Sequence, residues 1–316
     1  MPTLLSYVAI YVIWGSTFLA IRMAVESIPP LLMMGVRCTV AGALLIAAGA
    51  IRRERPTLGD WGPGVVAGAL MFGVPYAALG WAEQRIASGT AALLVATVPL
   101  WLVLVEWARG ARPSPCGLAG FAIGFGGVAR LVAHAWATPA SAAPMAAIVV
   151  SELAWAIGSV YLQPRLPRAL TLNAGMPLTC GGVMLLMWSA AAGEPQAFSI
   201  NTVTTSSGIA LAYLIVFGSI VAFSAYMFLL RVVPASRVST HAYVNPVIAV
   251  GLGAMFGGEA LTASVVGATV VIACGVALVL RARHAPRKVP RGPGAWGAHP
   301  APAFARRAPA RQASGT

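Results

Sequence analysis

The chain opens with the apolar stretch LLSYVAIYVIWGSTFLAIRMA, residues 4–24, in which Arg22 is the only charged residue. An α-helix needs about 20 predominantly apolar residues to cross the ~30 Å hydrocarbon core of a bilayer. No basic residue precedes the stretch, and no small-residue cleavage pattern leads from it into a polar chain. We therefore expect a first membrane helix here rather than a removed signal peptide.

Similar apolar runs fill the chain as far as residue 282. Of its 316 residues, 59% are hydrophobic and 9% charged, with a mean hydropathy of +0.81, which excludes a soluble globular protein. The sequence predicts an all-α integral membrane protein in which ten transmembrane helices form one bundle joined by short loops. The expected helices cover residues 4–24, 30–51, 62–82, 86–106, 114–134, 142–162, 171–192, 207–230, 236–256 and 262–281.

The positions of the basic residues orient these helices. With the amino terminus inside, the inner loops and the carboxyl-terminal tail hold 17 Lys and Arg residues and the outer loops hold 3, while Arg37 lies within the second helix. Because cytoplasmic loops carry the basic excess, we expect both termini to be cytoplasmic. The net charge of +13 then follows from topology, and no nucleic-acid partner is expected. Residues 285–316, rich in Pro, Ala and Arg, are predicted to be a disordered basic cytosolic tail.

The two halves of the chain repeat one another. A shift of 147 residues brings Pro99 onto Pro246 and Val103 onto Val250, and a shift of 141 brings Trp14 onto Trp155. Each half carries five expected helices, and an odd number of spans forces the halves into opposite orientations. We expect inverted repeats over residues 1–135 and 136–284, the arrangement of alternating-access transporters that bind solute near the bilayer midplane.

Several segments, in order and at regular spacing, resemble the EamA family of the drug/metabolite transporter superfamily, and within it the YedA-like inner-membrane exporters. They include IWGSTFLAIRMAVESIPPLLMMGVR (13–37), AEQRIASGTAALLVATVPLWLVL (82–104) and AYVNPVIAVGLGAMFGGEAL (242–261). The resemblance implies a bacterial inner-membrane permease of two five-helix EamA repeats that exports amino acids, metabolites or drug-like compounds. The sequence departs from the family at Arg112, which stands where the first repeat usually carries an acidic residue equivalent to Glu259.

A charge within a bilayer is costly unless it is paired or hydrated, so Glu152 stands out at the centre of the sixth expected helix. Trp155 and Ser159 follow at helical spacing, and we expect the three to line a central cavity. Glu152 is a candidate for binding a cationic group or exchanging a proton; a protonated or hydrogen-bonded carboxyl between helices is the alternative. Arg37 is interpreted as a structural clamp on helix carbonyls or a Glu, with a substrate carboxylate as the alternative.

Prolines interrupt the fourth and ninth expected helices at equivalent places. Pro246 removes a backbone donor and frees a carbonyl, and Pro99 does the same, a pattern that points to a transport site. His241 and Asn245 lie one turn apart beside Pro246. The predicted transport residues are Trp14, Thr17, Tyr76, Pro99, Glu152, Trp155, Ser159, His241, Tyr243, Asn245 and Pro246, with Glu83 as an outer gate. Arg22 and Glu26 are expected to form a surface pair.

These observations favour a secondary exporter of small organic solutes, with a passive facilitator on the same scaffold as the alternative. The eight acidic residues are scattered and the four cysteines form no metal-ligand spacing, so an integral membrane enzyme is disfavoured, and no cofactor or metal is expected. No phosphate-binding GxxxxGK motif is present. The expected partners are a small-molecule substrate and the lipid bilayer, with protons as a candidate coupling ion. A monomer and a homodimer both fit the sequence.

Overall fold

The computed structural model describes residues 3–110, 114–135, 139–165, 169–233, 238 and 240–281. Arg112 and the tail, residues 285–316, lie outside these ranges, and the side chain of Tyr243 is likewise not described. Within the described ranges the secondary structure is helical throughout, without a strand. This agrees with the all-α class expected from the apolar runs.

The helices follow the expected apolar runs closely. Seven stretches are long and apolar enough to cross a membrane, and residues 115–129, 244–256 and 265–275 form shorter apolar helices. The bounds are α1 Thr3–Val25, α2 Pro30–Ile51, α3 Leu58–Gly68, η1 Ala69–Gly73, α4 Val74–Glu83, α5 Ser88–Val95, α6 Val98–Ala108, α7 Pro115–Ala135, α8 Pro139–Leu162, η2 Gln163–Arg165, α9 Leu170–Ala191, α10 Glu194–Ala197, η3 Ile200–Thr202, α11 Thr205–Tyr213, η4 Leu214–Val221, α12 Ala222–Val232, α14 His241–Phe256 and α15 Ala263–Arg281.

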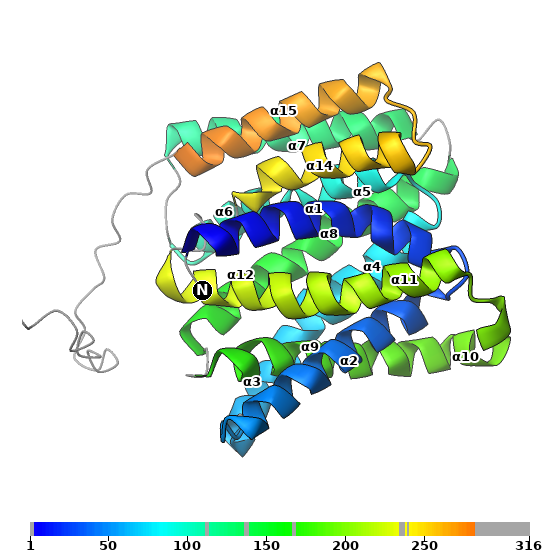
Figure 1. Cartoon of the computed structure of the whole chain (residues 1–316). Helices are drawn as coiled ribbons and strands as arrows, with labels where there is room; N and C mark the ends of the chain where they lie inside the picture. The colour runs from blue at the N-terminus through cyan, green and yellow to red at the C-terminus, as the bar shows by residue number, and fades with distance from the viewer. Residues whose placement is uncertain are drawn as a thin grey trace, which may run out of the picture. The chain divides into compact units, whose positions relative to one another are not determined.

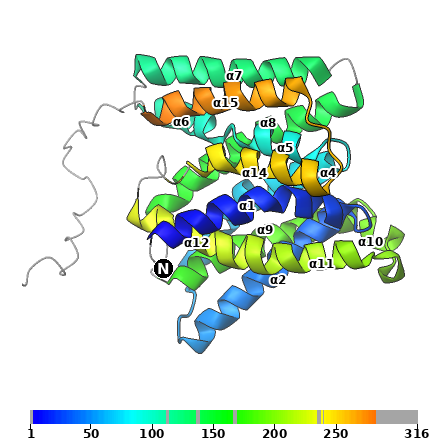
Figure 2. The same cartoon turned by 45° about the horizontal axis from the view of Figure 1, so that its top comes forward.

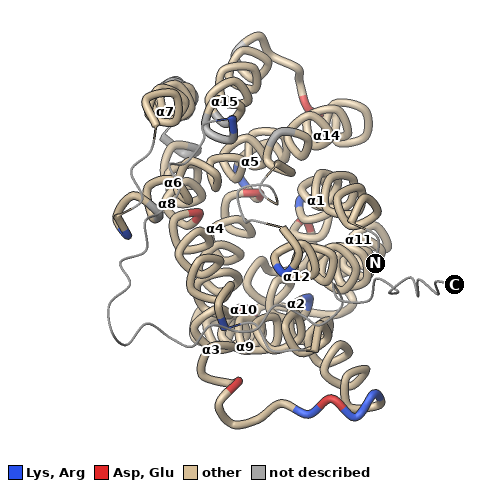
Figure 3. The backbone as a smooth tube through the Cα atoms, turned by 90° about the vertical axis from the view of Figure 1, so that its left-hand side faces the viewer, with Lys and Arg blue, Asp and Glu red and all other residues tan. Residues whose placement is uncertain are grey.

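The helices of the compact unit, residues 1–285, run side by side. Figures 1 and 2 show α7 and α15 paired along one edge and α2, α3 and α9 along the opposite edge, with α1 and α4 between them. Viewed end-on in Figure 3, charged positions are sparse within the bundle and densest in the loop that joins α2 to α3. An apolar exterior with few internal charges is what a bilayer requires.

Glycines allow the helix pairs at both edges to pack closely. A Cβ on Gly42 of α2 would lie 2.8 Å from the Gly175 carbonyl of α9, and a Cβ on Gly275 of α15 would lie 2.5 Å from Gly124 Cα of α7. Small residues at such interfaces let backbones approach, which drives helix association in lipid. These contacts fix the frame within which the central helices sit.

Two long helical stretches contain π-helical segments, which the hydrophobic pattern did not predict. One is η1, between α3 and α4, and the other is η4, between α11 and α12. A shift of 147 residues places Ala69–Gly73 on residues 216–220, inside η4. A π-helical turn leaves carbonyls poorly paired and is frequent at functional sites.

The two prolines of the predicted interruptions behave differently. Helix α5 ends at Val95 and α6 begins at Val98, so Pro99 lies in the first turn of α6, where no intrahelical donor is needed. The Thr97 hydroxyl bonds the Leu94 carbonyl at 2.7 Å within the break. Pro246 instead lies inside α14, which continues through it. The predicted interruption is therefore a true break only in the first half.

Candidate functional site

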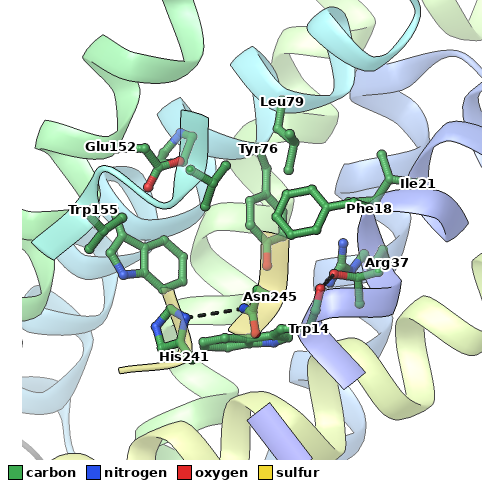
Figure 4. A pocket seen from close by; sticks show the side chains of 14 residues that line it. Trp14, Phe18, Ile21, Arg37, Tyr76, Leu79, Glu152, Trp155, His241 and Asn245 are labelled. Atoms are coloured by element: carbon green, nitrogen blue, oxygen red, sulfur yellow. Dashed lines mark hydrogen bonds between the residues drawn. The ribbon is translucent and has the colours of Figure 1, made fainter. Parts of the chain in front are cut away.

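The middle of the bundle contains a cavity of about 70 Å³ walled by seven helices, α1, α2, α4, α5, α6, α8 and α14. Eight residues predicted from the sequence line it: Trp14, Thr17, Arg37, Tyr76, Glu152, Trp155, His241 and Asn245. Figure 4 shows these side chains converging from opposite walls. The remaining lining is apolar and was not predicted individually: Phe18, Ile21, Pro75, Leu79, Val95 and Val98. We call this space the central cavity.

Arg37 provides the positive charge of the central cavity. Its side chain is buried, its Nε donates to the Ser219 hydroxyl of η4 at 2.9 Å, and its guanidinium lies 4.9 Å from the centre of the Tyr76 ring. The described residues give it no carboxylate partner, although an acidic or carbonyl partner was predicted. The predicted hydrogen bond or ion pair to carbonyls or a Glu is absent among the described residues, and a hydroxyl and an aromatic face hold Arg37 in place.

Glu152 provides the negative charge of the same cavity. It projects from α8, is only 3% exposed, and lies across the cavity from Arg37 in Figure 4. Within the described ranges no residue donates a hydrogen bond to its carboxylate or pairs with it as a cation. Of the two forms of the alternative, the hydrogen-bonded carboxyl finds no donor among the described residues, and the side chain lines the cavity.

Aromatic rings close the cavity at the end where α1 begins. The Trp14 ring centroid lies 5.1 Å from that of His241, 5.2 Å from that of Tyr226 and 6.2 Å from that of Trp155. The Trp14 indole nitrogen donates to the Gly218 carbonyl of η4 at 3.1 Å. The π-helical segment thus supplies both a carbonyl to Trp14 and a hydroxyl to Arg37, through Gly218 and Ser219.

His241 and Asn245 form a polar pair on the wall made by α14. The Asn245 amide lies 3.3 Å from His241 Nδ1, the contact dashed in Figure 4. With its nitrogen turned to the backbone, the amide donates to the carbonyls of His241 and Tyr11 at 3.1 Å each and its oxygen accepts from Nδ1. Asn245 therefore ties α14 to α1 beside the cavity.

Other predicted site residues lie outside the cavity lining. Ser159 is buried beneath Trp155, where its hydroxyl donates to the Trp155 carbonyl at 2.8 Å and lies 3.2 Å from the Tyr226 hydroxyl. Pro99 and Pro246 are buried in α6 and α14 without lining the cavity. Pro99 acts on the site through the backbone, because it has no N–H to donate to the Val95 carbonyl. Val95 itself lines the cavity.

A second, wider space lies at the end of the bundle where α1 ends, with a volume of about 590 Å³. We call it the vestibule; its charged lining residues are Arg22, Glu26, Glu83, Arg85 and Glu259. Glu83, predicted to be an outer gate, lines the vestibule rather than the central cavity.

The predicted pairing of Arg22 with Glu26 is wrong. Arg22 instead bonds Glu259, 237 residues away, with 2.7 Å between Nη1 and Oε1. Glu259 also accepts from the backbone amides of Ser88 and Gly89, at 2.7 and 3.1 Å, and so caps α5. Helix α1 ends at Val25, one residue before Glu26, so a tertiary partner replaces the local one.

Comparisons with known proteins identify the family of this helical membrane protein. The EamA-like transporter family matches residues 1–133 and 143–281. The chain belongs to the EamA-like transporter family. The resemblance stated from the motifs is therefore confirmed, and the family assigns transport rather than catalysis to this membrane protein.

Two relatives and one solved structure illustrate the EamA membership. The uncharacterized inner membrane transporter YedA of Escherichia coli is 38% identical over 268 residues, 83% of this chain and 85% of YedA. A probable terminal-alkyne amino-acid exporter of Streptantibioticus cattleyicolor is 30% identical over 65% of this chain and 78% of its own. A crystal structure of a 20% identical protein gives a TM-score of 0.64, covers 88% of this chain and 96% of its own, and supports the fold alone. The chain is thus a multi-pass inner-membrane transporter.

Proposed function

We propose that this EamA transporter is a secondary exporter that moves small zwitterionic organic solutes, such as amino acids, through the central cavity by alternating access. The observation that carries the proposal is a pair of buried, opposite charges that form no ion pair among the described residues: Arg37 on one wall and Glu152 on the other. A buried charge without a partner is unfavourable, so a ligand that brings the complementary charges is favoured at both walls. A carboxylate would bind Arg37 and an ammonium group would bind Glu152.

The size and lining of the cavity favour a small solute with an apolar part. A single water needs at least about 10–15 Å³ of such space, so about 70 Å³ holds a few waters or a small polar group. Phe18, Ile21 and Leu79 provide an apolar wall between the charges and the vestibule. Larger drug-like molecules would require the walls to move apart.

Alternating access is supported by the repeat in the sequence and by several structural features. These are the π-helical segments at positions related by the 147-residue shift, the break between α5 and α6, and the aromatic closure at one end of the cavity. We propose ten spans in two inverted five-helix repeats, residues 1–135 and 136–284, with both termini in the cytoplasm. The basic excess in the proposed inner loops supports this orientation.

Binding to the purified protein tests the proposal. A ligand that binds only the folded state raises the apparent melting temperature, so a thermal-shift panel of amino acids, nucleosides and organic cations identifies the class. We expect zwitterionic amino acids to stabilise the wild type and to lose that effect in Glu152→Gln and in Arg37→Gln. The control is Gln196→Ala, an exposed residue of α10 that lines neither the cavity nor the vestibule. Stabilisation by organic cations alone, or by amino acids equally in all variants, would contradict the proposal.

A further inference from the structure

The central cavity and the vestibule lie in line along the same two helices. On α1, Ile21 lines the cavity and Arg22 the vestibule; on α4, Leu79 lines the cavity and Glu83 the vestibule. Four residues of α-helix span about 6 Å, so about one helical turn separates the two spaces along α4. The barrier between cavity and vestibule is therefore thin, and its charged side consists of Arg22, Glu83 and Glu259.

The Arg22–Glu259 ion pair links helices on the vestibule side of this barrier. It joins α1 to the segment after α14, and the same carboxylate holds the first two backbone amides of α5. Glu259 thereby links α1, α5 and the end of α14 at one point. Separating α1 from this segment would have to break the ion pair.

Glu83 lies beside this ion pair and forms no ion pair of its own among the described residues. Its side chain is 2% exposed, both carboxylate oxygens are buried without a hydrogen-bond partner, and it lines the vestibule. It interacts electrostatically with Arg22 of α1, Arg37 of α2 and Glu259, while Arg85 and Glu26 line the same vestibule. Among the other elements packed on α4, η1 and α5 carry no charged residue and α8 presents Glu152 to the central cavity.

We infer that Glu83 is a proton-binding site on the vestibule side, and that its protonation allows the Arg22–Glu259 gate to close. With the gate closed, the Glu83 carboxylate is buried away from water beside a second carboxylate, that of Glu259. Arg22 is already paired with Glu259. A charged Glu83 is strongly disfavoured there. A proton from the vestibule water bound to one carboxylate oxygen of Glu83 leaves a neutral acid and removes the repulsion.

With the gate open, water reaches Glu83 and the carboxylate is stable in its charged form. Proton binding then favours the closed form by the same interaction through which closure favours proton binding, since the coupling is reciprocal. For an exporter, this links the arrival of an outer proton to closure of the outer side. The inference rests on the proposed function, which supplies the orientation of the protein in the membrane and the direction of transport. It differs from the sequence-based alternative, which placed proton exchange at Glu152.

Access from outside to the central cavity, across the barrier, measures gate closure directly. The protein is reconstituted with Cys38, Cys116, Cys180 and Cys274 replaced by alanine and Leu79→Cys added in the cavity wall, on the inner side of the barrier. The initial rate of modification by a membrane-impermeant maleimide is measured at low and high outer pH. Each rate is divided by that of Thr202→Cys, an exposed position, which removes the pH dependence of the thiol reaction itself.

We expect the corrected rate at Leu79→Cys to be about 5-fold or more lower at low pH than at high pH. Glu83→Gln, which mimics the protonated acid, should give the low rate at both pH values, whereas the control Glu26→Gln should keep the pH response. Arg22→Gln, which breaks the ion pair, should give the high rate at both, and it tests the gate even if Glu83→Gln does not fold.

A pH response that survives in Glu83→Gln would overturn the inference, as would one abolished by Glu26→Gln. A response to Na⁺ at constant pH would assign the site to a metal cation instead and would also overturn it. The assay contains no solute, so these outcomes leave the proposed function intact. Conversely, a failure to find any bound or transported zwitterion would not change the labelling result.

Discussion

The ion pair between Arg22 and Glu259 allows a quantitative prediction. Replacing Glu259 with Gln preserves the size of the side chain but removes the charge that Arg22, Ser88 and Gly89 share. A hydrogen bond to a charged group contributes about 1.5–3 kcal/mol, and a negative charge at a helix N-terminus about 0.3–1 kcal/mol. Glu259 is 8% exposed and Arg22 35%, so we take the lower part of this range for the pair.

We expect Glu259→Gln to lower the free energy of unfolding by about 2 kcal/mol, which corresponds to a fall of about 4 °C in Tm for a chain of this size. In a double-mutant cycle with Arg22→Gln, the coupling energy should be about 1 kcal/mol, the upper end for a partly exposed pair. Thermal unfolding in detergent, followed by intrinsic tryptophan fluorescence, measures all four proteins of the cycle.

Glu194 provides the matched control. It caps α2 through the amides of Leu31 and Leu32, at 3.2 and 2.7 Å, and accepts from the Ser189 hydroxyl at 2.8 Å, with no ion pair among the described residues. Glu194→Gln should cost about 1 kcal/mol and show no coupling to Arg22→Gln. Additive effects of Arg22→Gln and Glu259→Gln would refute the ion pair as a link between the two elements.

Three further predictions concern packing and the central cavity. Gly42→Ala should lower the free energy of unfolding by about 2 kcal/mol or more, because its Cβ would meet α9 backbone, whereas Gly62→Ala, which meets open space, should be neutral or slightly stabilising in the same melts. Trp14→Phe should lower the free energy of unfolding by about 1–2 kcal/mol, because it leaves the Gly218 carbonyl unpaired. Trp188→Phe, at an exposed ring, should leave the free energy of unfolding almost unchanged, and equal Tm values for the two variants would contradict the Trp14 hydrogen bond. Arg37→Gln should weaken binding of a zwitterionic ligand about 10-fold or more, equivalent to about 1.4 kcal/mol, as measured by calorimetry, whereas Arg85→Gln should leave the Kd unchanged.

The helices could be predicted from the sequence because the bilayer imposes one simple rule. A span must be apolar over a fixed length, and the ranges expected for α1, α2 and α9 lie within one residue of the observed bounds at each end. Buried charge was equally visible, since Glu152 and Arg37 interrupt apolar runs, and both line the central cavity. Composition and periodicity are therefore enough to find a functional residue when it is a charge within an otherwise apolar span.

The partners of these charges could not be predicted. Arg22 binds Glu259 and Arg37 binds Ser219 across separations of 237 and 182 residues, distances over which helical spacing carries no information. The π-helical segments η1 and η4 were also missed, because an extra residue per turn changes backbone hydrogen bonds without changing which residues are apolar. The apolar wall of the cavity could not be predicted for a related reason. Phe18 and Leu79 stand in uniformly apolar runs, in which the sequence does not distinguish a side chain that faces lipid from one that faces solute.

Counterflow in proteoliposomes tests most directly whether the central cavity carries a zwitterion across the membrane. Vesicles are loaded with the unlabelled amino acid that most stabilises the protein and diluted into a trace of the labelled form. The proposal predicts transient accumulation of label above equilibrium in the wild type and in Gln196→Ala, and its loss in both Arg37→Gln and Glu152→Gln. No accumulation with any stabilising zwitterion, or accumulation unchanged in both charge variants, would contradict it.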